Sequence, residues 1–311
     1  MKVSICISTW NRATKLCKII NLLENQNFPQ EEFEIIVSDS HSTDNTENIM
    51  TDLMRKYNNI KHIHINNIIS EKRNNAMKQA QGDVIVLLDD DVYPMPNFIQ
   101  SHYDANLNNN KYVFCGKIEF PEEKITSSNY YNFRNQQHKI SEQEKNNLNF
   151  SKIVTMNMSF PKSFLEYFGL MNENYICYGC EDVDYGYKIT QKGFILKYLP
   201  SAYGIHDEDS SDIIKYGEKL YKTGLYGSRI FKQECYEGWR KIYSKKVKFG
   251  KILSLNIIKK KIERDLIRND KNLKKYNYFK YKLYIYCCFL SGVRDQKRYR
   301  KLSIEDSKKG L

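Results

Sequence analysis

Residues 84–91 read Val-Ile-Val-Leu-Leu-Asp-Asp-Asp, five apolar residues followed directly by three carboxylates. A short apolar run rich in β-branched residues is typical of a buried strand. In an extended chain alternate side chains share a face, so we expect Asp89 and Asp91 to point the same way and Asp90 to point away. Two carboxylates at the end of a strand can hold Mg²⁺ or Mn²⁺ together with a diphosphate. The alternative is a solvated acidic turn.

The residues before this strand alternate between strand-like and helix-like segments. Repeated βα units predict an α/β fold with a mostly parallel, doubly wound sheet, whose ligands bind at the carboxyl ends of the strands. Beyond residue 91 the pattern is looser, and the polar stretch 127–150 is expected to be a loop or a helical insertion. The expected strands are 3–8, 34–38, 60–65, 84–88, 112–118, 153–160 and 195–199, and the expected helices are 14–25, 46–57 and 70–81.

Basic residues are concentrated in the last third of the chain. The 311 residues carry 49 Lys and Arg against 37 Asp and Glu, a formal net charge of +12, and 41% of them are hydrophobic, which excludes a disordered or fibrous protein. Residues 1–211 hold 21 basic and 27 acidic side chains, whereas residues 212–311 hold 28 and 10. We therefore expect an α/β domain over 1–210 and a basic, mainly helical region over 211–311.

The sequence favours a cytoplasmic protein. We find no apolar run of signal-peptide or membrane-spanning length. The eight cysteines are scattered over the chain, which is typical of reduced packing residues rather than of a disulfide framework.

A second group of carboxylates opens a predicted helix that ends near residue 192. Glu181, Asp182 and Asp184 would all lie at the positive end of this helix, where a single carboxylate suffices as a cap. A cluster of like charges is costly unless it binds a cation or takes up a proton. Downstream, His206 lies among acidic residues and is either a metal ligand or a surface histidine.

Taken in order, these motifs resemble those of the family 2 glycosyltransferases. The series begins with Thr-Trp-Asn-Arg at 9–12 and Val-Ser-Asp-Ser-His-Ser-Thr-Asp-Asn-Thr at 37–46, and it continues through Arg73-Asn74 and the Asp triplet to Gly-Cys-Glu-Asp at 179–182. The resemblance covers about residues 1–207. It implies the GT-A fold, a nucleotide-sugar donor and a divalent metal ion.

The later motifs narrow the resemblance. Residues 88–96 and 178–184 look like the corresponding stretches of bacterial chondroitin polymerase and the beta-1,4-galactosyltransferases. Those enzymes usually read Trp-Gly-Gly-Glu-Asp and use a downstream histidine on the metal, a position that His206 matches. Tyr178 and Cys180 depart from the usual Trp and Gly, so the identity of the sugar stays open.

Carried over by position, the resemblance implies a site for a UDP-sugar. Asp39 matches the acid that hydrogen-bonds the uracil ring, the backbone around Thr9 with Arg12 would line the nucleotide, and Arg73 matches a basic residue near the diphosphate. Ser40 stands where many relatives have a second Asp.

The metal-binding part of the site would come from the Asp triplet and the downstream histidine. Asp91 and His206 would bind Mn²⁺ or Mg²⁺, and Asp89 would lie over the ribose or the metal shell. Asp90 is expected to be one of the residues that bind the nucleotide-sugar.

The catalytic residues would come from the second carboxylate group. Asp182 is expected to be the general base that takes the proton of an acceptor hydroxyl, giving inversion, while Glu181 would hold sugar hydroxyls. Related retaining enzymes have Asn where this chain has Asp182, which favours inversion. The acceptor is left open among a glycan, a lipid-linked saccharide and a peptide. The alternatives are a retaining transferase and a catalytically silent nucleotide-sugar-binding or membrane-scaffolding protein.

The basic region beyond residue 211 lies outside the resemblance. Apolar stripes at helical spacing over 251–266 and an aromatic-rich stretch at 276–290 suit helices that pack on each other or on a second copy of the chain. They also suit helices at an anionic membrane surface, as in a peripheral protein of the inner face of the cell membrane. Nucleic acid is a weaker candidate partner, since no nucleic-acid-binding motif is evident.

Overall fold

The computed structural model describes residues 1–209, 211–250 and 255–296. The chain divides into two compact units, and each is assembled from separate stretches. The sheet unit comprises residues 1–119, 140–173 and 185–208, and the helical unit comprises residues 120–139, 174–184 and those from 209 onward. The division is therefore not a single cut near residue 210, because two earlier stretches also belong to the helical unit.

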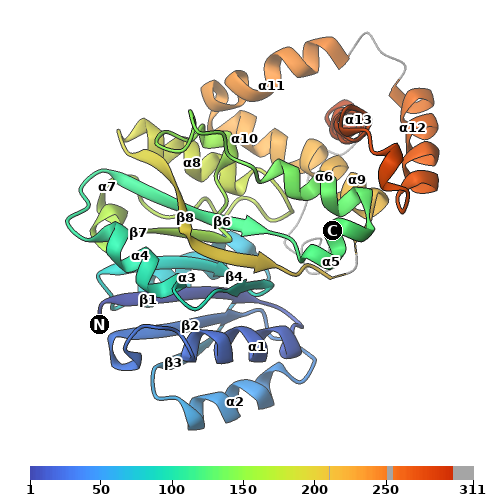
Figure 1. Ribbon diagram of the computed structural model, residues 1–311. Coiled ribbons are helices and arrows are strands. Elements are labelled where there is room, and N and C mark those ends of the chain that lie inside the picture. Colours follow the sequence, from blue (N-terminus) through green and yellow to red (C-terminus); the bar gives the residue numbers. More distant parts are fainter. Residues whose placement is uncertain (210, 251–254, 297–311) are drawn as a thin grey trace. The chain divides into compact units, whose positions relative to one another are not determined.

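Eight strands form one sheet in the sheet unit, in the order β3-β2-β1-β4-β7-β6-β8-β5 (Figure 1). Strands β3, β2, β1 and β4 are parallel, β7 is antiparallel to both β4 and β6, β8 is parallel to β6, and β5 is antiparallel to β8. Their bounds are β1 Val3–Thr9, β2 Phe33–Asp39, β3 Ile60–His64, β4 Val84–Asp89, β5 Val92–Pro94, β6 Tyr112–Glu119, β7 Asn157–Pro161 and β8 Ile195–His206.

Helices alternate with the first four strands, as the sequence predicts. Helices α1 (Ala13–Glu24) and α2 (Thr46–Lys56) contact each other, while α3 (Ile69–Gln79) packs on β1 and β2. The apolar stripe of α1 is buried and joins a core with the strand residues. The mostly parallel, doubly wound sheet is thus confirmed, and it brings the ends of β1, β2 and β4 to one edge.

The second half of the sheet differs from the expected strands. The elements that were missed include β5 and helix α4 (Phe98–Asn106). Strand β7 starts at Asn157 rather than 153, and β8 continues to His206 instead of ending at 199. Pro200 makes the sequence look like a strand end. In the structure β8 bulges there, because pairing with β6 moves from Gly116–Leu199 to Lys117–Tyr203 and then continues.

A buried amide holds this bulge in place. Asn157 is 0% exposed, and its Nδ2 donates to the backbone oxygens of Ala202 on β8 (2.9 Å) and Lys117 on β6 (3.2 Å). Its Oδ1 lies 2.8 Å from Nε2 of His102 on α4, and Nδ1 of His102 lies 2.8 Å from the Ser159 hydroxyl. A neutral imidazole with its proton on Nε2 satisfies all of these groups. Asn157 therefore joins β6, β7, β8 and α4.

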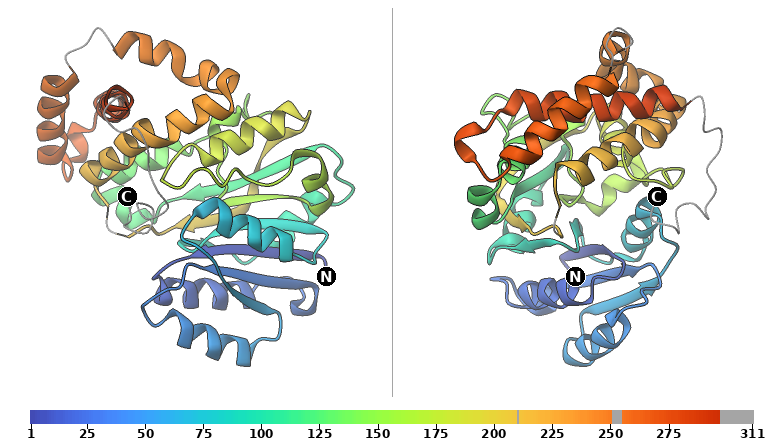
Figure 2. Two further views of the ribbon diagram at one scale, coloured as in Figure 1. Left: turned by 180° about the vertical axis from the view of Figure 1, so that it is seen from behind. Right: turned by 90° about the vertical axis from the view of Figure 1, so that its right-hand side faces the viewer.

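The helical unit has its own aromatic core. Tyr130 and Phe133 of α6 are buried with Leu266 of α12 and with Tyr281 and Tyr284 of α13, and α12 lies alongside α13 (Figures 1 and 2). The remaining helices, shared between the units, are α5 Glu122–Ser127, α6 Asn129–Gln137, α7 Leu165–Phe168, α8 Glu181–Gln191, α9 Ile213–Lys222, α10 Ser228–Glu234, α11 Tyr236–Gly250, α12 Leu255–Asn269 and α13 Tyr278–Asp295.

The apolar stripes of the basic region contribute to this packing. Residues 251–254 of the predicted stripe lie outside the described residues, but Ile262 and Leu266 join the aromatic core. Among the described helices, none combines the length and the apolar character that crossing a membrane requires.

The His102 network predicts a pH dependence of stability. Burial lowers the pKa of His102 to about 4, although the hydrogen bond with Asn157 opposes this shift. An unfolded chain, with the ordinary value near 6.5, takes up the proton first. The contribution of His102 to the free energy of unfolding is therefore fully present above pH 6.5. It decreases by about 3 kcal/mol as the pH falls toward 4. Urea unfolding across this range should show a shallower pH slope for His102→Gln than for the wild type, and equal slopes would contradict the assignment.

Candidate active site

Three of the predicted site residues end neighbouring parallel strands. Thr9 ends β1, Asp39 ends β2 and Asp89 ends β4. The strand register pairs Thr9 with Asp39 and Ser8 with Asp89, so the three positions share one edge of the sheet. This is the edge at which ligands bind in sheets of this kind.

The three consecutive aspartates have three different partners. Arg73 Nη2 donates to Asp89 Oδ1 (2.8 Å), Thr9 Oγ1 donates to Asp90 Oδ2 (2.7 Å), and Arg12 Nη1 donates to Asp91 Oδ2 (3.0 Å). Residues 90 and 91 form a turn that leads into β5. The alternation expected for an extended strand therefore ends at Asp89, and it does not decide the directions of Asp90 and Asp91.

Asp91 and His206 are brought together by the pairing of β5 with β8. Val92 lies opposite His206, and the Asp207 amide donates to the Asp91 carbonyl oxygen (2.8 Å). His206 Nε2 is consequently 3.4 Å from Asp91 Oδ1. Neighbouring ligands of an octahedral Mg²⁺ or Mn²⁺ are about 3 Å apart, given bonds of about 2.1 Å. The two side chains thus fit one shared divalent ion.

Burial and neighbouring charge set the protonation of these carboxyls. Burial alone would raise the pKa of Asp91, but contacts with His206 and Arg12 hold it well below its usual range. Burial and the adjacent Asp91 charge raise the pKa of Asp90 to about 7, against the opposing effects of Arg12 and Thr9. The triplet therefore holds one strongly acidic carboxyl beside one that binds its proton readily.

Lys72 is a further residue at this edge that the sequence reasoning missed. Its side chain is buried, and Nζ donates to the Thr9 carbonyl oxygen (3.2 Å) and to Asn67 Oδ1 (3.3 Å). Burial lowers the pKa of Lys72 to about 8, while the nearby Asp90 opposes the shift. The basic pair Lys72-Arg73 was the available signal, but only Arg73 matched a family position.

The loops after β1 and β2 are tied to each other. Ser42 Oγ donates to Asp39 Oδ1 (2.5 Å) and accepts from the Asn11 amide (2.7 Å). Asn11 Oδ1 in turn accepts from the Thr43 amide (2.7 Å). Asn11 adopts a left-handed backbone (φ 52°), which Asn tolerates better than most residues. These bonds fix the direction of Asp39.

Glu181 and Asp182 lie in the helical unit, whereas the other eight predicted site residues lie in the sheet unit. Both are in the first turn of α8, as predicted. Glu181 Oε2 accepts from the Gly179 amide (2.9 Å). Asp184 is fully buried and accepts from Cys235 Sγ (2.8 Å), so its role within the helical unit is structural.

The departure from glycine at position 180 has a conformational consequence. Cys180 has φ 74°, a left-handed backbone that glycine adopts without strain and other residues rarely adopt. Gly179 is also left-handed, and a Cβ there would lie 2.3 Å from Thr223 Oγ1. The backbone before α8 therefore has the shape that a Gly-Gly pair favours, although the second residue is cysteine.

Known proteins are similar to this chain over most of its length. Bacillus subtilis YfnE, named an uncharacterized glycosyltransferase, is 25% identical over 267 residues, which cover 68% of this chain and 66% of that protein. Pasteurella multocida chondroitin synthase is 25% identical over 244 residues, covering 66% of this chain and 25% of that protein. The chain thus spans less than two thirds of these relatives.

Solved structures show the same fold. The mannosyltransferase PcManGT from Pyrobaculum calidifontis, in complex with GDP-Man and Mn²⁺, has a TM-score of 0.61 at 14% identity and covers 96% of this chain and 88% of that chain. TarS 1–349 from S. aureus, in complex with UDP-GlcNAc, has a TM-score of 0.55 at 17% identity and covers 99% and 95%. The expected GT-A fold is confirmed.

The model of the family described as glycosyl transferase family 2 matches residues 4–168, more than half of the chain. Together with the ordered strand-end motifs, this match establishes that the chain belongs to glycosyltransferase family 2.

Proposed function

We propose that this protein is a metal-dependent, inverting glycosyltransferase that moves a hexose or an N-acetylhexosamine from a UDP-sugar to an acceptor hydroxyl. The observation that carries the proposal is the approach of His206 Nε2 to Asp91 Oδ1, 3.4 Å apart, on a sheet edge that also presents Thr9 and Asp39. A carboxylate and an imidazole suit Mn²⁺ or Mg²⁺, which would neutralise charge on a departing diphosphate.

The cations around the Asp triplet suit an anionic donor. Arg73 and Arg12 each donate a hydrogen bond to a carboxylate of the triplet, and the buried Lys72, next to Arg73 in the sequence, donates to the Thr9 carbonyl oxygen. A diphosphate entering this edge offers oxygens that arginine binds with similar geometry. These side chains would stabilise the negative charge that grows on the leaving group. Asp39, oriented by Ser42, would accept a hydrogen bond from the uracil ring of the donor.

The acceptor hydroxyl needs a base because it is too weak an acid to ionise alone. Asp182, in the first turn of α8, is the residue that we propose for this proton transfer. Glu181, oriented by the Gly179 amide, would hold sugar hydroxyls. Attack on the face opposite the leaving diphosphate inverts the anomeric carbon.

The relatives support a glycan or lipid-linked acceptor. Their names include a poly(ribitol-phosphate) beta-glucosyltransferase and a beta-1,3-glucosyltransferase acting on an undecaprenol-linked saccharide. Both names state a β-linked product.

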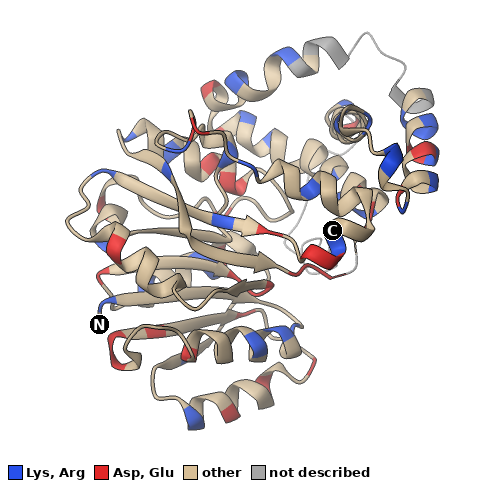
Figure 3. Ribbon diagram, viewed as in Figure 1, with Lys and Arg blue, Asp and Glu red and all other residues tan. Residues whose placement is uncertain are grey.

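An anionic membrane surface is the further partner that we propose. The turn between α12 and α13 and the first turn of α13 each expose an apolar side chain, Leu273 (42%) and Phe279 (80%) respectively. Figure 3 shows Lys and Arg repeated along α12. Each basic residue near an anionic leaflet adds about 1 kcal/mol. The exposed lysines of this turn and of early α13 are Lys271, Lys274, Lys275, Lys280 and Lys282.

Asp91→Asn should abolish Mn²⁺-dependent binding of UDP, because it removes the carboxylate charge from the shared ion. Isothermal titration with UDP, at fixed Mn²⁺, measures this effect. Asp52→Asn, at an exposed site paired with Arg55, is the matched control and should bind as the wild type does. An unchanged Mn²⁺ dependence in Asp91→Asn would remove Asp91 from the metal site.

Asp182→Asn should leave UDP-sugar binding intact and slow transfer by about 10²–10⁴-fold, the usual contribution of a positioned base. Screening UDP-sugars for hydrolysis first identifies the donor, since hydrolysis needs no acceptor. The anomeric configuration of the wild-type product, read by NMR, then tests inversion independently. Full transfer activity in the variant would rule out Asp182 as the general base. A product that retains the anomeric configuration of the donor would rule out the inverting mechanism.

Phe279→Ser should weaken binding to vesicles that contain phosphatidylserine by about ten-fold, because burying a Phe side chain contributes about 1.5–3 kcal/mol. Sedimentation with anionic and with neutral vesicles measures the partition. Tyr167→Ser removes an aromatic ring of similar exposure (62%) from the sheet unit and serves as the control. Equal partition of the two variants and the wild type would exclude this turn as the membrane contact.

A further inference from the structure

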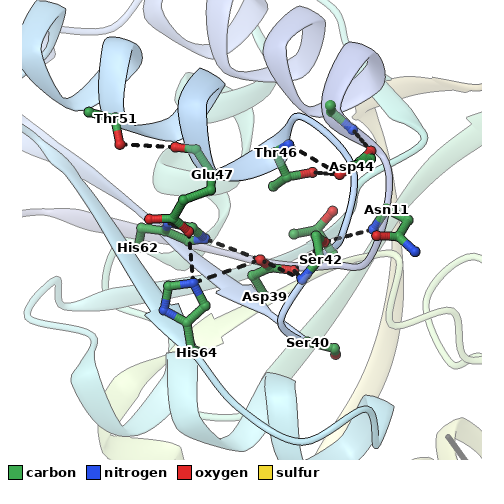
Figure 4. A network of polar contacts seen from close by, with 12 residues as sticks. Asn11, Asp39, Ser40, Ser42, Asp44, Thr46, Glu47, Thr51, His62 and His64 are labelled. Atoms are coloured by element: carbon green, nitrogen blue, oxygen red, sulfur yellow. Dashed lines mark hydrogen bonds and ion pairs between the residues drawn. The ribbon is translucent and has the colours of Figure 1, made fainter.

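A second group of metal-ligating side chains lies on β2, β3 and α2. It consists of Asp39, Glu47, His62 and His64, called here the two-histidine cluster (Figure 4). His62 and His64 are two residues apart on β3 and so share a face of the strand. Parallel pairing sets His64 beside Asp39 of β2, and Glu47 reaches the group from the first turn of α2.

The separations within the cluster suit a single small cation. Asp39 Oδ2 is 3.6 Å from His62 Nε2 and 3.9 Å from His64 Nε2. Glu47 Oε2 is 2.9 Å from His64 Nε2 and 3.8 Å from His62 Nδ1. One ligand atom from each of the four residues can be chosen so that all lie within 4.8 Å of one another. Ligands of a tetrahedral zinc ion are about 3.4 Å apart, given bonds of about 2.1 Å.

His62 supplies an independent reason to expect a ligand. Its side chain is only 2% exposed, and its Nε2 makes no hydrogen bond. The nearest carboxylate oxygen, Asp39 Oδ2, is slightly too far for one. Leaving a buried polar atom unbonded is costly. A metal ion between these atoms would give His62 Nε2 the partner that it lacks.

The neighbours of the cluster orient Asp39 toward the histidines. Ser42 Oγ donates to Oδ1 of Asp39, and the Ser42 backbone amide donates to Oδ2 (3.2 Å), the oxygen that also faces His62 and His64. On the outer side the His64 ring stacks on His41, with centroids 5.3 Å apart.

We propose that the two-histidine cluster binds a borderline transition-metal ion, of which Zn²⁺ is the best fit. Imidazole nitrogen and carboxylate oxygen are both zinc ligands, four ligands suit the tetrahedral ion, and the two carboxylates would neutralise its charge. This site is separate from Asp91, in the turn before β5, and from His206, at the end of β8. Strand geometry makes it visible in the sequence as His-x-His at 62–64.

Zn²⁺ and UDP are expected to compete for Asp39, an inference that rests on the proposed function. Asp39 would serve both the metal ion and the uracil ring. Zn²⁺ should therefore weaken UDP binding. If Zn²⁺ binds and the affinity for UDP is unchanged, the proposed contact of Asp39 with the uracil ring is wrong, but the proposed metal site is still supported.

Direct titration tests the site without relying on activity. Metal-free protein is titrated with Zn²⁺ by calorimetry, and X-ray absorption of the zinc-loaded protein reports the ligand atoms. We expect nitrogen and oxygen ligands with two imidazoles and no sulfur. His64→Gln and Glu47→Gln, both at partly exposed positions, should each weaken binding by about ten-fold or more.

Two further variants separate this site from its surroundings. His41→Gln removes the ring that stacks on His64 without removing a ligand, and Asp91→Asn disables the other proposed metal site. Both should retain the zinc affinity lost in His64→Gln. Affinity that is unchanged in His64→Gln and Glu47→Gln, affinity lost only in Asp91→Asn, or sulfur ligation in the absorption spectrum would each overturn the proposal.

Discussion

The amide of Asn157 is the constraint on which the second half of the sheet depends. The antiparallel pairing of β7 with β6 spans two positions, Phe114–Ser159 and Cys115–Met158, and the pairing of β6 with β8 shifts register between Leu199 and Tyr203. Asn157 donates to both β6 and β8 at this point. A one-residue slip of β8 would turn its side chains to the other face. His206, the last residue of β8, meets Asp91 only because this alignment holds.

Paired charges explain how an acidic sheet edge remains folded. Each carboxylate of the Asp triplet has a donor of its own, from Arg73, Thr9 or Arg12. Buried carboxylates without such partners would repel one another and favour their protonated forms. The same donors are suited to phosphate oxygens, so folding and donor binding draw on one set of side chains.

The sequence was sufficient for the parts of the fold that local pattern determines. Apolar runs and helical stripes predicted the first four strands and three helices to within a few residues, and the end of the fourth strand located Asp89. Thr9 and Asp39 were found through the family resemblance. Tertiary context decided the rest. β5 is too short to stand out, and β8 crosses a proline. The turn at Asp90 depends on pairing between segments more than a hundred residues apart. Lys72 was missed because a single polar residue in an ordinary helix carries no strong pattern. The two-histidine cluster was missed because His-x-His at 62–64 does not by itself indicate Asp39 and Glu47, which come from other elements.

The interleaving of the two units along the chain has a consequence for folding during synthesis. Tyr130 and Phe133 of the helical unit leave the ribosome long before Tyr281 and Tyr284, which cover them in the folded protein. In the sheet, β5 and β6 likewise cannot pair with β8 until residues 195–206 have been synthesised. Such distant contacts slow folding and leave apolar surface exposed meanwhile. A fragment that ends near residue 210 would leave these rings uncovered, and aggregation rather than an isolated sheet domain is its expected fate.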